Sequence, residues 1–140
     1  MLTNRRVIRI EWGDCDPAGI IFYPRYFVYF DVCTHALFER AGCSMRELQK
    51  AYGMLGFPLV DARARFVLPC AYGEDVTIES GISKFGRSSF HVEHRVYKGE
   101  TLAVEGVEVR VWVGPSAAKP GQMEARPIPP EVIRRFTGPN

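Results

Sequence analysis

The spacing of apolar residues predicts a strand and then a long helix in the first part of the chain. Apolar and polar positions alternate from Arg6 to Trp12, which is the two-residue period of a strand. The segment 13–19 is rich in Gly, Asp and Pro and therefore ends that strand. A long helix is predicted from Pro24 to about Gly42, because proline suits the first helical turn and glycine follows many helix ends. The stripe of this helix contains Phe27, Phe30, Thr34, Leu37, Phe38 and Ala41.

The second half of the chain returns to the period of strands. Apolar positions alternate with mostly charged ones from Val60 to Leu68. Short turns at 86–87 and 98–100 separate the segments that follow, which makes antiparallel hairpins the expected connection. Pro115–Pro130 is predicted as a Pro-rich loop, with one or two helical turns near Glu131–Phe136. Three further strands are predicted, at Val76–Phe85, Ser89–Tyr97 and Leu102–Val113.

A second, short helix is predicted after Ser44, because Glu47 follows at the spacing of a capping box. The expected order is therefore strand, long helix, short helix and four strands. One long helix and about five antiparallel strands form an α+β fold in which the sheet wraps around the helix. With so few elements, one face of the sheet can stay apolar, so we expect the protein to oligomerise.

Composition and charge fit one globular domain over residues 1–140. The 140 residues are 46% hydrophobic and 24% charged, which suffices for a core without a disulfide or metal. The formal net charge of +2 argues against a broad nucleic-acid interface, which needs a clustered basic face. No apolar run has the character of a signal peptide or of a membrane span. We therefore expect a cytoplasmic protein. The four cysteines match no zinc signature, so we expect free thiols and no metal or cofactor.

The segment Gly13–Pro24 carries the candidate chemistry. It places Asp14 and Asp16 two residues apart in a Gly/Pro turn, ahead of the predicted helix start. A helix N-terminus presents unpaired backbone N–H groups and the positive end of the helix dipole, which can polarise a carbonyl. An aspartate nearby can then attack the carbonyl or activate water. Aspartates beside Gly and Pro more commonly cap turns, so the pattern alone leaves both interpretations open.

The run Asp14-Cys-Asp-Pro-Ala-Gly-Ile-Ile-Phe-Tyr-Pro24 resembles the active-site signature of the 4-hydroxybenzoyl-CoA thioesterase family, in its Asp-dependent branch. The similarity continues through Tyr26 and Asp31, the strand Thr77–Glu79 and the segment Arg87–Phe90, so it covers most of the chain. The resemblance implies a hotdog fold that hydrolyses acyl-CoA, with active sites at dimer interfaces and dimers paired into tetramers.

The resemblance also implies catalytic roles for two residues. Asp16 matches the catalytic aspartate, and the backbone N–H of Tyr23 matches the group that polarises the thioester carbonyl. Attack by Asp16 would give a mixed anhydride that water hydrolyses, and direct activation of water by Asp16 is the rival mechanism. A dehydratase of the same fold would need a histidine at the head of the long helix, where this chain has Tyr23, Pro24 and Arg25.

Asp31 is the residue that bears on the acyl group. In the branch specific for 4-hydroxybenzoyl-CoA, an aspartate at this position meets the phenol hydroxyl, so Asp31 is a candidate contact for a hydroxylated aromatic ring. The alternative is a buried salt bridge to Arg63 or Arg65, because a carboxylate on an apolar stripe needs a partner. Four phenylalanines could line an aromatic pocket, although such residues more often belong to the core: Phe22, Phe27, Phe30 and Phe90.

A basic turn is the candidate site for the phosphates of coenzyme A. The family places its nucleotide site near this turn, which here contains Lys84, Arg87 and Ser88. The alternative is an ordinary solvated turn, which we favour for Lys84. Asp61 and Arg63 are guesses for residues that a neighbouring subunit contributes.

Two other candidate groups have simple structural explanations. Cys15 adjoins Asp16 but has no histidine near it in sequence, so we expect a packing role rather than a nucleophile. His91 and His94 are three apart in a predicted strand, so they point to opposite faces and do not form a metal site together.

Three functions compete on these grounds. The first is hydrolysis of an aromatic, 4-hydroxybenzoyl- or benzoyl-type acyl-CoA to the free acid and coenzyme A. The second is hydrolysis of short or medium aliphatic acyl-CoA. The third is a non-catalytic acyl-CoA-binding protein, against which the presence of Asp16 argues.

Overall fold

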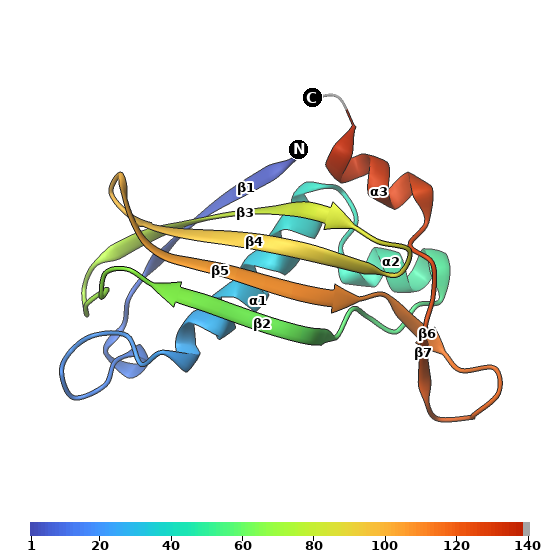
Figure 1. Cartoon of the computed structure of the whole chain (residues 1–140), viewed down its shortest axis with the longest axis horizontal. Helices are drawn as coiled ribbons and strands as arrows, with labels where there is room; N and C mark the ends of the chain where they lie inside the picture. Colours follow the sequence, from blue (N-terminus) through green and yellow to red (C-terminus); the bar gives the residue numbers. More distant parts are fainter. Residues whose placement is uncertain (139–140) are drawn as a thin grey trace.

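A five-stranded antiparallel sheet packs against one long helix in the computed structural model, which describes residues 1–138 (Figure 1). The strand order is β1-β3-β4-β5-β2, so β2 lies at one open edge and β1 at the other. The α+β fold predicted from the sequence is therefore confirmed. The helices and strands are β1 (Thr3–Arg9), α1 (Pro24–Arg40), α2 (Met45–Tyr52), β2 (Leu59–Phe66), β3 (Asp75–Phe85), β4 (Ser89–Lys98), β5 (Thr101–Val111), β6 (Val113–Pro115), β7 (Met123–Ala125) and α3 (Pro130–Thr137).

The long and the short helix begin at the expected residues, and the long helix also ends close to the expected one. Pro24 occupies the first position of α1, and Gly42 follows the helix with a φ of 77°, in the left-handed region that favours glycine. Ser44 caps α2, because its Oγ accepts a hydrogen bond from the Glu47 N–H at 3.4 Å. None of the helices in residues 1–138 combines the length and apolarity that a membrane crossing requires.

The first strand differs from its predicted position. The structure places β1 at Thr3–Arg9, whereas the alternating pattern extended to Trp12. The Asp14 carboxylate accepts a hydrogen bond from the Glu11 N–H at 3.3 Å and begins a short 3-10 turn over Trp12–Asp14. Ile10 is buried and Trp12 is 62% exposed within the 3-10 turn, so the predicted extension of the strand to Trp12 is wrong.

The C-terminal region is more ordered than the predicted loop. The last sheet strand, β5, ends at Val111, and Val113 begins the two-stranded ribbon of β6 and β7. The Trp112 N–H donates to the Ser88 carbonyl at 2.7 Å, which turns the chain away from β5. The loop predicted at Pro115–Pro130 therefore contains β7, and α3 begins at its last residue.

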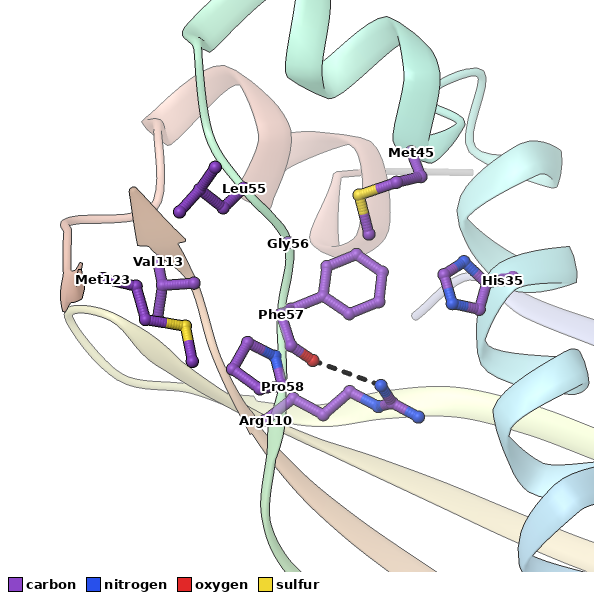
Figure 2. Close-up of a pocket in the computed structure, with 9 residues that line it drawn as sticks. All are labelled: His35, Met45, Leu55, Gly56, Phe57, Pro58, Arg110, Val113 and Met123. Carbon is purple, nitrogen blue, oxygen red and sulfur yellow. Dashed lines mark hydrogen bonds between the residues drawn. The ribbon is translucent and has the colours of Figure 1, made fainter. Parts of the chain in front are cut away.

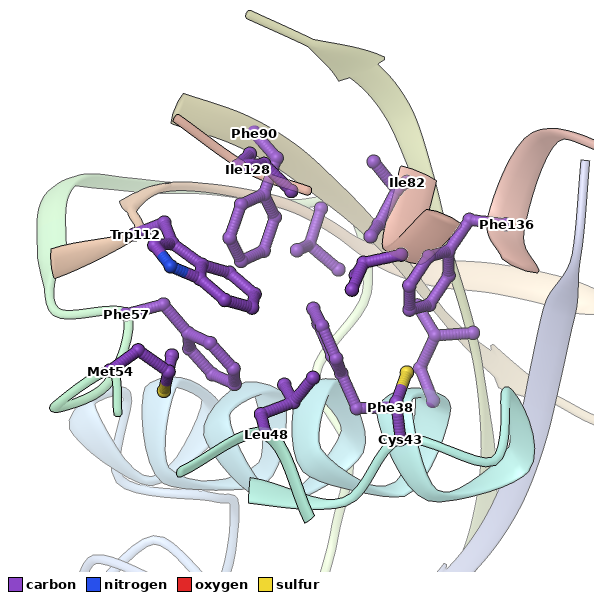
Figure 3. Packing of buried hydrophobic residues seen from close by; sticks show 13 residues of the cluster. Phe38, Cys43, Leu48, Met54, Phe57, Ile82, Phe90, Trp112, Ile128 and Phe136 are labelled. Atoms are coloured by element: carbon purple, nitrogen blue, oxygen red, sulfur yellow. The ribbon is translucent and has the colours of Figure 1, made fainter. Parts of the chain in front are cut away.

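Aromatic side chains fill the space between α1, the sheet and α3. Phe38 of α1 lies 4.7 Å from the ring centroids of both Phe57 and Phe136 and 5.5 Å from that of Phe90 (Figure 3). Phe136 belongs to α3, so this helix closes one end of the core. Burial of several such rings is the main stabilising contribution to the fold.

The middle of α1 approaches the sheet closely because β5 carries a glycine there. A Cβ at position 106 would collide with the ring of Phe30. Phe30 instead stacks on His94, the cross-strand neighbour of Gly106, with centroids 4.7 Å apart and planes inclined by 5°. This contact brings the polar groups of β4 and β5 directly under α1.

The opposite face of the sheet carries one row of alternating charges across all five strands. From β1 to β2, the successive cross-strand partners in this row are Arg5, Glu79, Arg95, Glu105 and Arg65. Opposite charges on directly opposed residues stabilise a sheet, and a one-residue slip would move the charges of a strand to its other face and break these pairs. The row therefore helps to specify the strand register that positions the site.

Candidate active site

The segment before α1 folds into a small turn around Asp16. The Gly19 N–H donates to the Asp16 carbonyl at 2.9 Å, and the Ala18 N–H donates to Asp16 Oδ1 at 2.8 Å. Pro17 and Gly19 suit the second and fourth positions of such a turn. The turn is joined to α1 because the Phe22 N–H donates to the Asp14 carbonyl at 2.8 Å.

The two aspartates of this segment have different surroundings. Asp14 uses both carboxylate oxygens, since Oδ2 accepts from the Glu11 N–H and Oδ1 lies 3.8 Å from Arg25 Nε. Asp16 forms the turn with Oδ1 alone, and its Oδ2 has no hydrogen-bond partner among residues 1–138. Asp16 therefore does form a turn, and one of its carboxylate oxygens stays available for chemistry.

The start of α1 provides the second half of the expected site. Tyr23 is the N-cap of α1, and its backbone N–H has no acceptor among residues 1–138. It therefore lies at the positive end of a 17-residue helix with a free donor. Beside it is a pocket of about 290 Å³. The pocket is lined by Ile20, Ile21, Tyr23, Tyr26, Phe66, Val67, Leu68 and Pro69.

The two aromatic candidates Phe22 and Phe27 do not line this pocket. Phe22 is 50% exposed, and its ring packs edge to face against Tyr23 at 5.5 Å. Phe27 is partly buried and packs against Phe30 with centroids 5.9 Å apart. Their assignment to the substrate stays a prediction.

Cys15 has the properties of a packing residue. Its Sγ lies 3.5 Å from the Glu11 carbonyl oxygen. Loss of solvent contact, followed by the negative charges of Asp14 and Asp16, raises the pKa of the Cys15 thiol. A raised pKa disfavours the thiolate, which is the nucleophilic form. Residues 1–138 also contain no group of three His, Cys, Asp or Glu side chains arranged to hold a metal.

The predicted coenzyme A turn lies far from Asp16 in the same chain. Arg87 and Ser88 follow the end of β3, whereas Asp75 at its start pairs with Arg9, just before the Asp16 turn. The 11 residues of β3 span about 33 Å at the usual rise per residue. One chain therefore does not bring the predicted phosphate contacts to its own Asp16.

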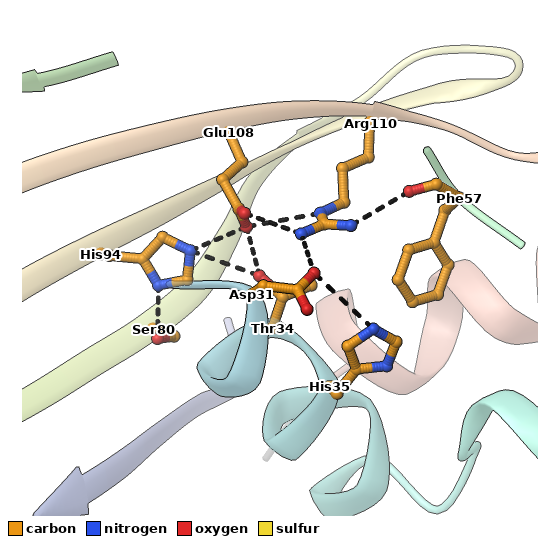
Figure 4. Close-up of polar contacts among 8 residues, drawn as sticks. All are labelled: Asp31, Thr34, His35, Phe57, Ser80, His94, Glu108 and Arg110. Atoms are coloured by element: carbon orange, nitrogen blue, oxygen red, sulfur yellow. Dashed lines mark hydrogen bonds and ion pairs between the residues drawn. The ribbon is translucent and has the colours of Figure 1, made fainter. Parts of the chain in front are cut away.

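Asp31 forms an ion pair, but not the predicted one. Its Oδ1 accepts from Arg110 Nη2 at 2.7 Å and lies 3.8 Å from His35 Nε2 (Figure 4). The proposed pairing with Arg63 or Arg65 is wrong, because both belong to the outward face of the edge strand β2. Its side chain is also 52% exposed, so Asp31 lies beside the buried stripe of α1 rather than within it.

Arg110 connects Asp31 to a buried polar cluster that the sequence did not reveal. Glu108 accepts hydrogen bonds from Arg110 Nη2 at 2.7 Å, from the Thr34 hydroxyl and from His94 Nε2 at 3.0 Å. The Ser80 hydroxyl lies 2.7 Å from His94 Nδ1 and completes the cluster. Glu108 and Arg110 lie an even number of residues from the buried Val104 in β5, so all three point to the same face of the sheet. This spacing could have predicted from the sequence that both charged residues face inward.

Burial and hydrogen bonding act in opposite directions on Glu108. Burial alone would raise the pKa of its carboxyl, but hydrogen bonds from His94, Arg110 and Thr34 lower that pKa to about 2. Glu108 is 1% exposed and is therefore a buried, fully paired anion. His91 and His94 point to opposite faces as predicted, and only His94 belongs to this cluster.

Comparison with known proteins identifies the family of this fold. Residues 10–136 match the sequence model of the thioesterase-like superfamily. The 4-hydroxybenzoyl-CoA thioesterase of Pseudomonas sp. strain CBS-3 is 36% identical over 110 residues, which are 74% of this chain and 78% of that protein. A gentisyl-coenzyme A thioesterase has a structure similar to this one, with a TM-score of 0.80 at 31% identity over 96% of this chain and 100% of the other.

A third similar protein is a mutant of 4-hydroxybenzoyl-CoA thioesterase, with asparagine in place of an aspartate, complexed with 4-hydroxybenzoyl-CoA. Its TM-score is 0.85 at 30% identity over 96% of this chain and 98% of the other. The fold and these matches define the protein as a thioester hydrolase with the hotdog fold. The chain belongs to the thioesterase-like superfamily, within the family of 4-hydroxybenzoyl-CoA thioesterase.

Proposed function

We propose that the protein is a single-domain, cytoplasmic enzyme that hydrolyses an aromatic acyl-CoA, of 4-hydroxybenzoyl or benzoyl type, to the free acid and coenzyme A. The observation that carries the proposal is that the Asp16 turn, with one free carboxylate oxygen, is hydrogen-bonded through Asp14 to the start of α1, where the Tyr23 N–H is free. The relatives that act on 4-hydroxybenzoyl-CoA and gentisyl-coenzyme A support an aromatic substrate.

Asp16 acts as nucleophile or general base in this proposal. As nucleophile, Oδ2 attacks the thioester carbonyl carbon, the Tyr23 N–H stabilises the oxyanion, and the coenzyme A thiolate leaves. Water then hydrolyses the mixed anhydride to the acid and the Asp16 carboxylate. As general base, Asp16 removes a proton from the water that attacks the same carbon. Repeated turnover in ¹⁸O-labelled water detects the anhydride route when water attacks the Asp16 carbonyl carbon, because the Asp16 carboxylate becomes labelled only in that case.

The proposed acyl specificity depends on Asp31. Tyr23 and Asp31 are eight residues apart on α1, a rise of about 12 Å. An acyl group whose carbonyl meets the Tyr23 N–H could therefore extend along the helix toward the free oxygen of Asp31. Benzoyl-CoA and 4-hydroxybenzoyl-CoA should be compared for the native protein and for Asp31→Ala. Equal preference in both proteins would remove Asp31 from specificity.

A substrate panel also tests the alternative acyl groups. The apolar pocket beside Tyr23, with Ile20, Ile21 and Leu68 in its lining, suits an aliphatic chain as well as a ring. Preference for short or medium aliphatic acyl-CoA would therefore favour the second function. Binding of acyl-CoA without release of free thiol would favour the non-catalytic one.

A second copy of the chain completes the proposed site. The β2 strand lies at an open edge, and its exposed apolar residues include Leu59, Val60 and Phe66. Antiparallel pairing of two β2 strands would place the Leu59 end of one copy beside the Phe66 end of the other. The Arg87–Ser88 turn of one copy would then approach the Asp16 turn of its partner.

We therefore propose a dimer through β2, and a homotetramer built from two such dimers. Asp61 and Arg63, which form an exposed ion pair at 3.2 Å on β2, would lie at the dimer interface. Sedimentation of the native chain should give the mass of four copies. A monomer at micromolar concentration would contradict both the assembly and the completed site.

A further inference from the structure

Arg110 joins Asp31 to the interior of the protein. It is 4% exposed, and its Nη2 donates to both Asp31 Oδ1 and Glu108 Oε2 at 2.7 Å (Figure 4). Its Nη1 donates to the Phe57 carbonyl at 3.1 Å, and its guanidinium lies 5.5 Å from the Phe57 ring centroid. A planar guanidinium with this set of contacts has one orientation available.

We propose that Arg110 is a positioning residue for substrate specificity. It holds the Asp31 carboxylate in one orientation, so that the other carboxylate oxygen accepts a hydrogen bond from a hydroxyl on the acyl group of the substrate. This inference rests on the proposed function, because it requires a hydroxylated aromatic acyl-CoA as substrate.

The charge balance of the cluster supports this role. Glu108 is a buried anion paired with Arg110, and that pair alone neutralises the guanidinium. Asp31 therefore adds a second negative charge that the burial of Arg110 does not require. The Asp31 side chain is half exposed, so this charge faces the surface, where a ligand can reach it.

A pocket lies beside the Asp31–Arg110 pair. It has a volume of about 330 Å³, and its polar side chains, His35 and Arg110, are the two partners of Asp31 Oδ1 (Figure 2). Asp31 Oδ2 has no partner among residues 1–138. Apolar walls with a few fixed polar groups suit a ring that carries one hydrogen-bond donor. The remaining lining consists of Met45, Leu55, Gly56, Phe57, Pro58, Val113 and Met123.

The support for Arg110 extends across the sheet. Glu108 is held by Thr34 of α1 and by His94 of β4, and His94 is held by Ser80 of β3. Stacking on the ring of Phe30 also holds the His94 ring in place. The orientation of Asp31 is thus set by rigid elements rather than by a loop, as precise recognition requires.

The test is the specificity ratio, defined as kcat/KM for 4-hydroxybenzoyl-CoA divided by kcat/KM for benzoyl-CoA. Arg110→Gln should lower this ratio roughly tenfold to a hundredfold, the range expected for loss of a hydrogen bond to a charged group. The loss should appear in KM for the hydroxylated substrate, while kcat for benzoyl-CoA is retained. Arg110→Lys should recover part of the ratio. Arg95→Gln, on the opposite face of the sheet, is the matched control and should keep the native ratio.

A double variant tests whether both residues act through one contact. Asp31→Asn with Arg110→Gln should have the same ratio as Asp31→Asn alone. Additive losses, a native ratio in Arg110→Gln, or equal losses for both substrates would overturn the inference and leave the thioesterase proposal standing. If Arg110→Gln does not fold by circular dichroism, Arg110→Lys decides, and a native ratio there overturns the inference. If the native protein does not prefer the hydroxylated substrate, the proposed acyl specificity itself fails, and the inference fails with it.

Discussion

The two aspartates of the proposed function are held in contrasting ways. Asp16 lies in a surface turn, where its Oδ1 accepts a backbone N–H from two residues further along the chain. Asp31 projects from the middle of α1, and its Oδ1 is bound by Arg110, 79 residues away. In each residue the second carboxylate oxygen has no partner among residues 1–138.

This difference separates a reactive group from a recognition group. The Asp16 turn depends on local backbone contacts, and the nearby helix start supplies the electrostatic stabilisation. The Asp31 carboxylate depends on a buried cluster that spans α1, β3, β4 and β5. Changes near Asp16 should therefore alter turnover with little effect on stability, whereas changes in the cluster should alter both specificity and stability.

Among changes outside Asp16 itself, the largest effect is expected from removal of the Tyr23 N–H. Proline at position 23 lacks this donor, and the φ of −53° at Tyr23 is one that proline can adopt. Loss of one oxyanion donor should lower kcat roughly a hundredfold to a thousandfold. Tyr23→Phe keeps the N–H and is the control, with near-native kcat expected. Steady-state kinetics with 4-hydroxybenzoyl-CoA measures both, and equal kcat values for the two variants would exclude the Tyr23 N–H.

An intermediate effect is expected from Glu108, on stability rather than on chemistry. Its pKa in the folded protein is about 2, below the ordinary value of 4.5. The resulting stabilisation is present above pH 4.5 and is lost as the pH falls toward 2, and it amounts to roughly 3 kcal/mol.

Glu108→Gln removes the titrating group. This variant should be less stable at pH 7 and should lose less further stability on acidification than the native protein. Urea unfolding between pH 7 and pH 3 measures the difference. Glu124→Gln, on the exposed strand β7, should retain the native acid profile. An unaltered profile in Glu108→Gln would contradict the assignment of a buried, paired anion.

The smallest effect is expected at Cys15, next to Asp16. Its thiol has a raised pKa and a packing role, so Cys15→Ser should retain kcat/KM within about twofold. Resistance to a thiol-alkylating reagent should accompany that result. Loss of turnover in Cys15→Ser comparable to that of Tyr23→Pro would instead make Cys15 the nucleophile.

The same contrast explains what could be predicted from the sequence. The Asp16 turn, the helix start at Pro24 and the Ser44 cap depend on residues within a few positions of one another, and each was found where it was expected. The resemblance to a thioesterase family then gave the turn a chemical role. Local patterns and a continuous signature are both visible in a single sequence.

The partner of Asp31 could not be predicted by the same means. The contacts around Asp31 form only because the β4–β5 register and the approach of α1 over Gly106 bring distant residues together. These residues are Asp31, Thr34, His94 and Glu108. Most residues of β5 are apolar on both faces, so the sequence did not show which face Glu108 and Arg110 occupy. Residues 10–12 were wrongly assigned to the first strand for a local reason, since the Asp14 carboxylate competes with the strand for backbone N–H groups.

The central claim is that this chain hydrolyses acyl-CoA thioesters with Asp16. Release of free thiol should be followed for the native protein and for Asp16→Asn, across a panel of aromatic and aliphatic acyl-CoA. The account predicts turnover by the native protein, highest with 4-hydroxybenzoyl-CoA, and none above background by Asp16→Asn with an unchanged circular dichroism spectrum. Near-native thiol release by Asp16→Asn would contradict it.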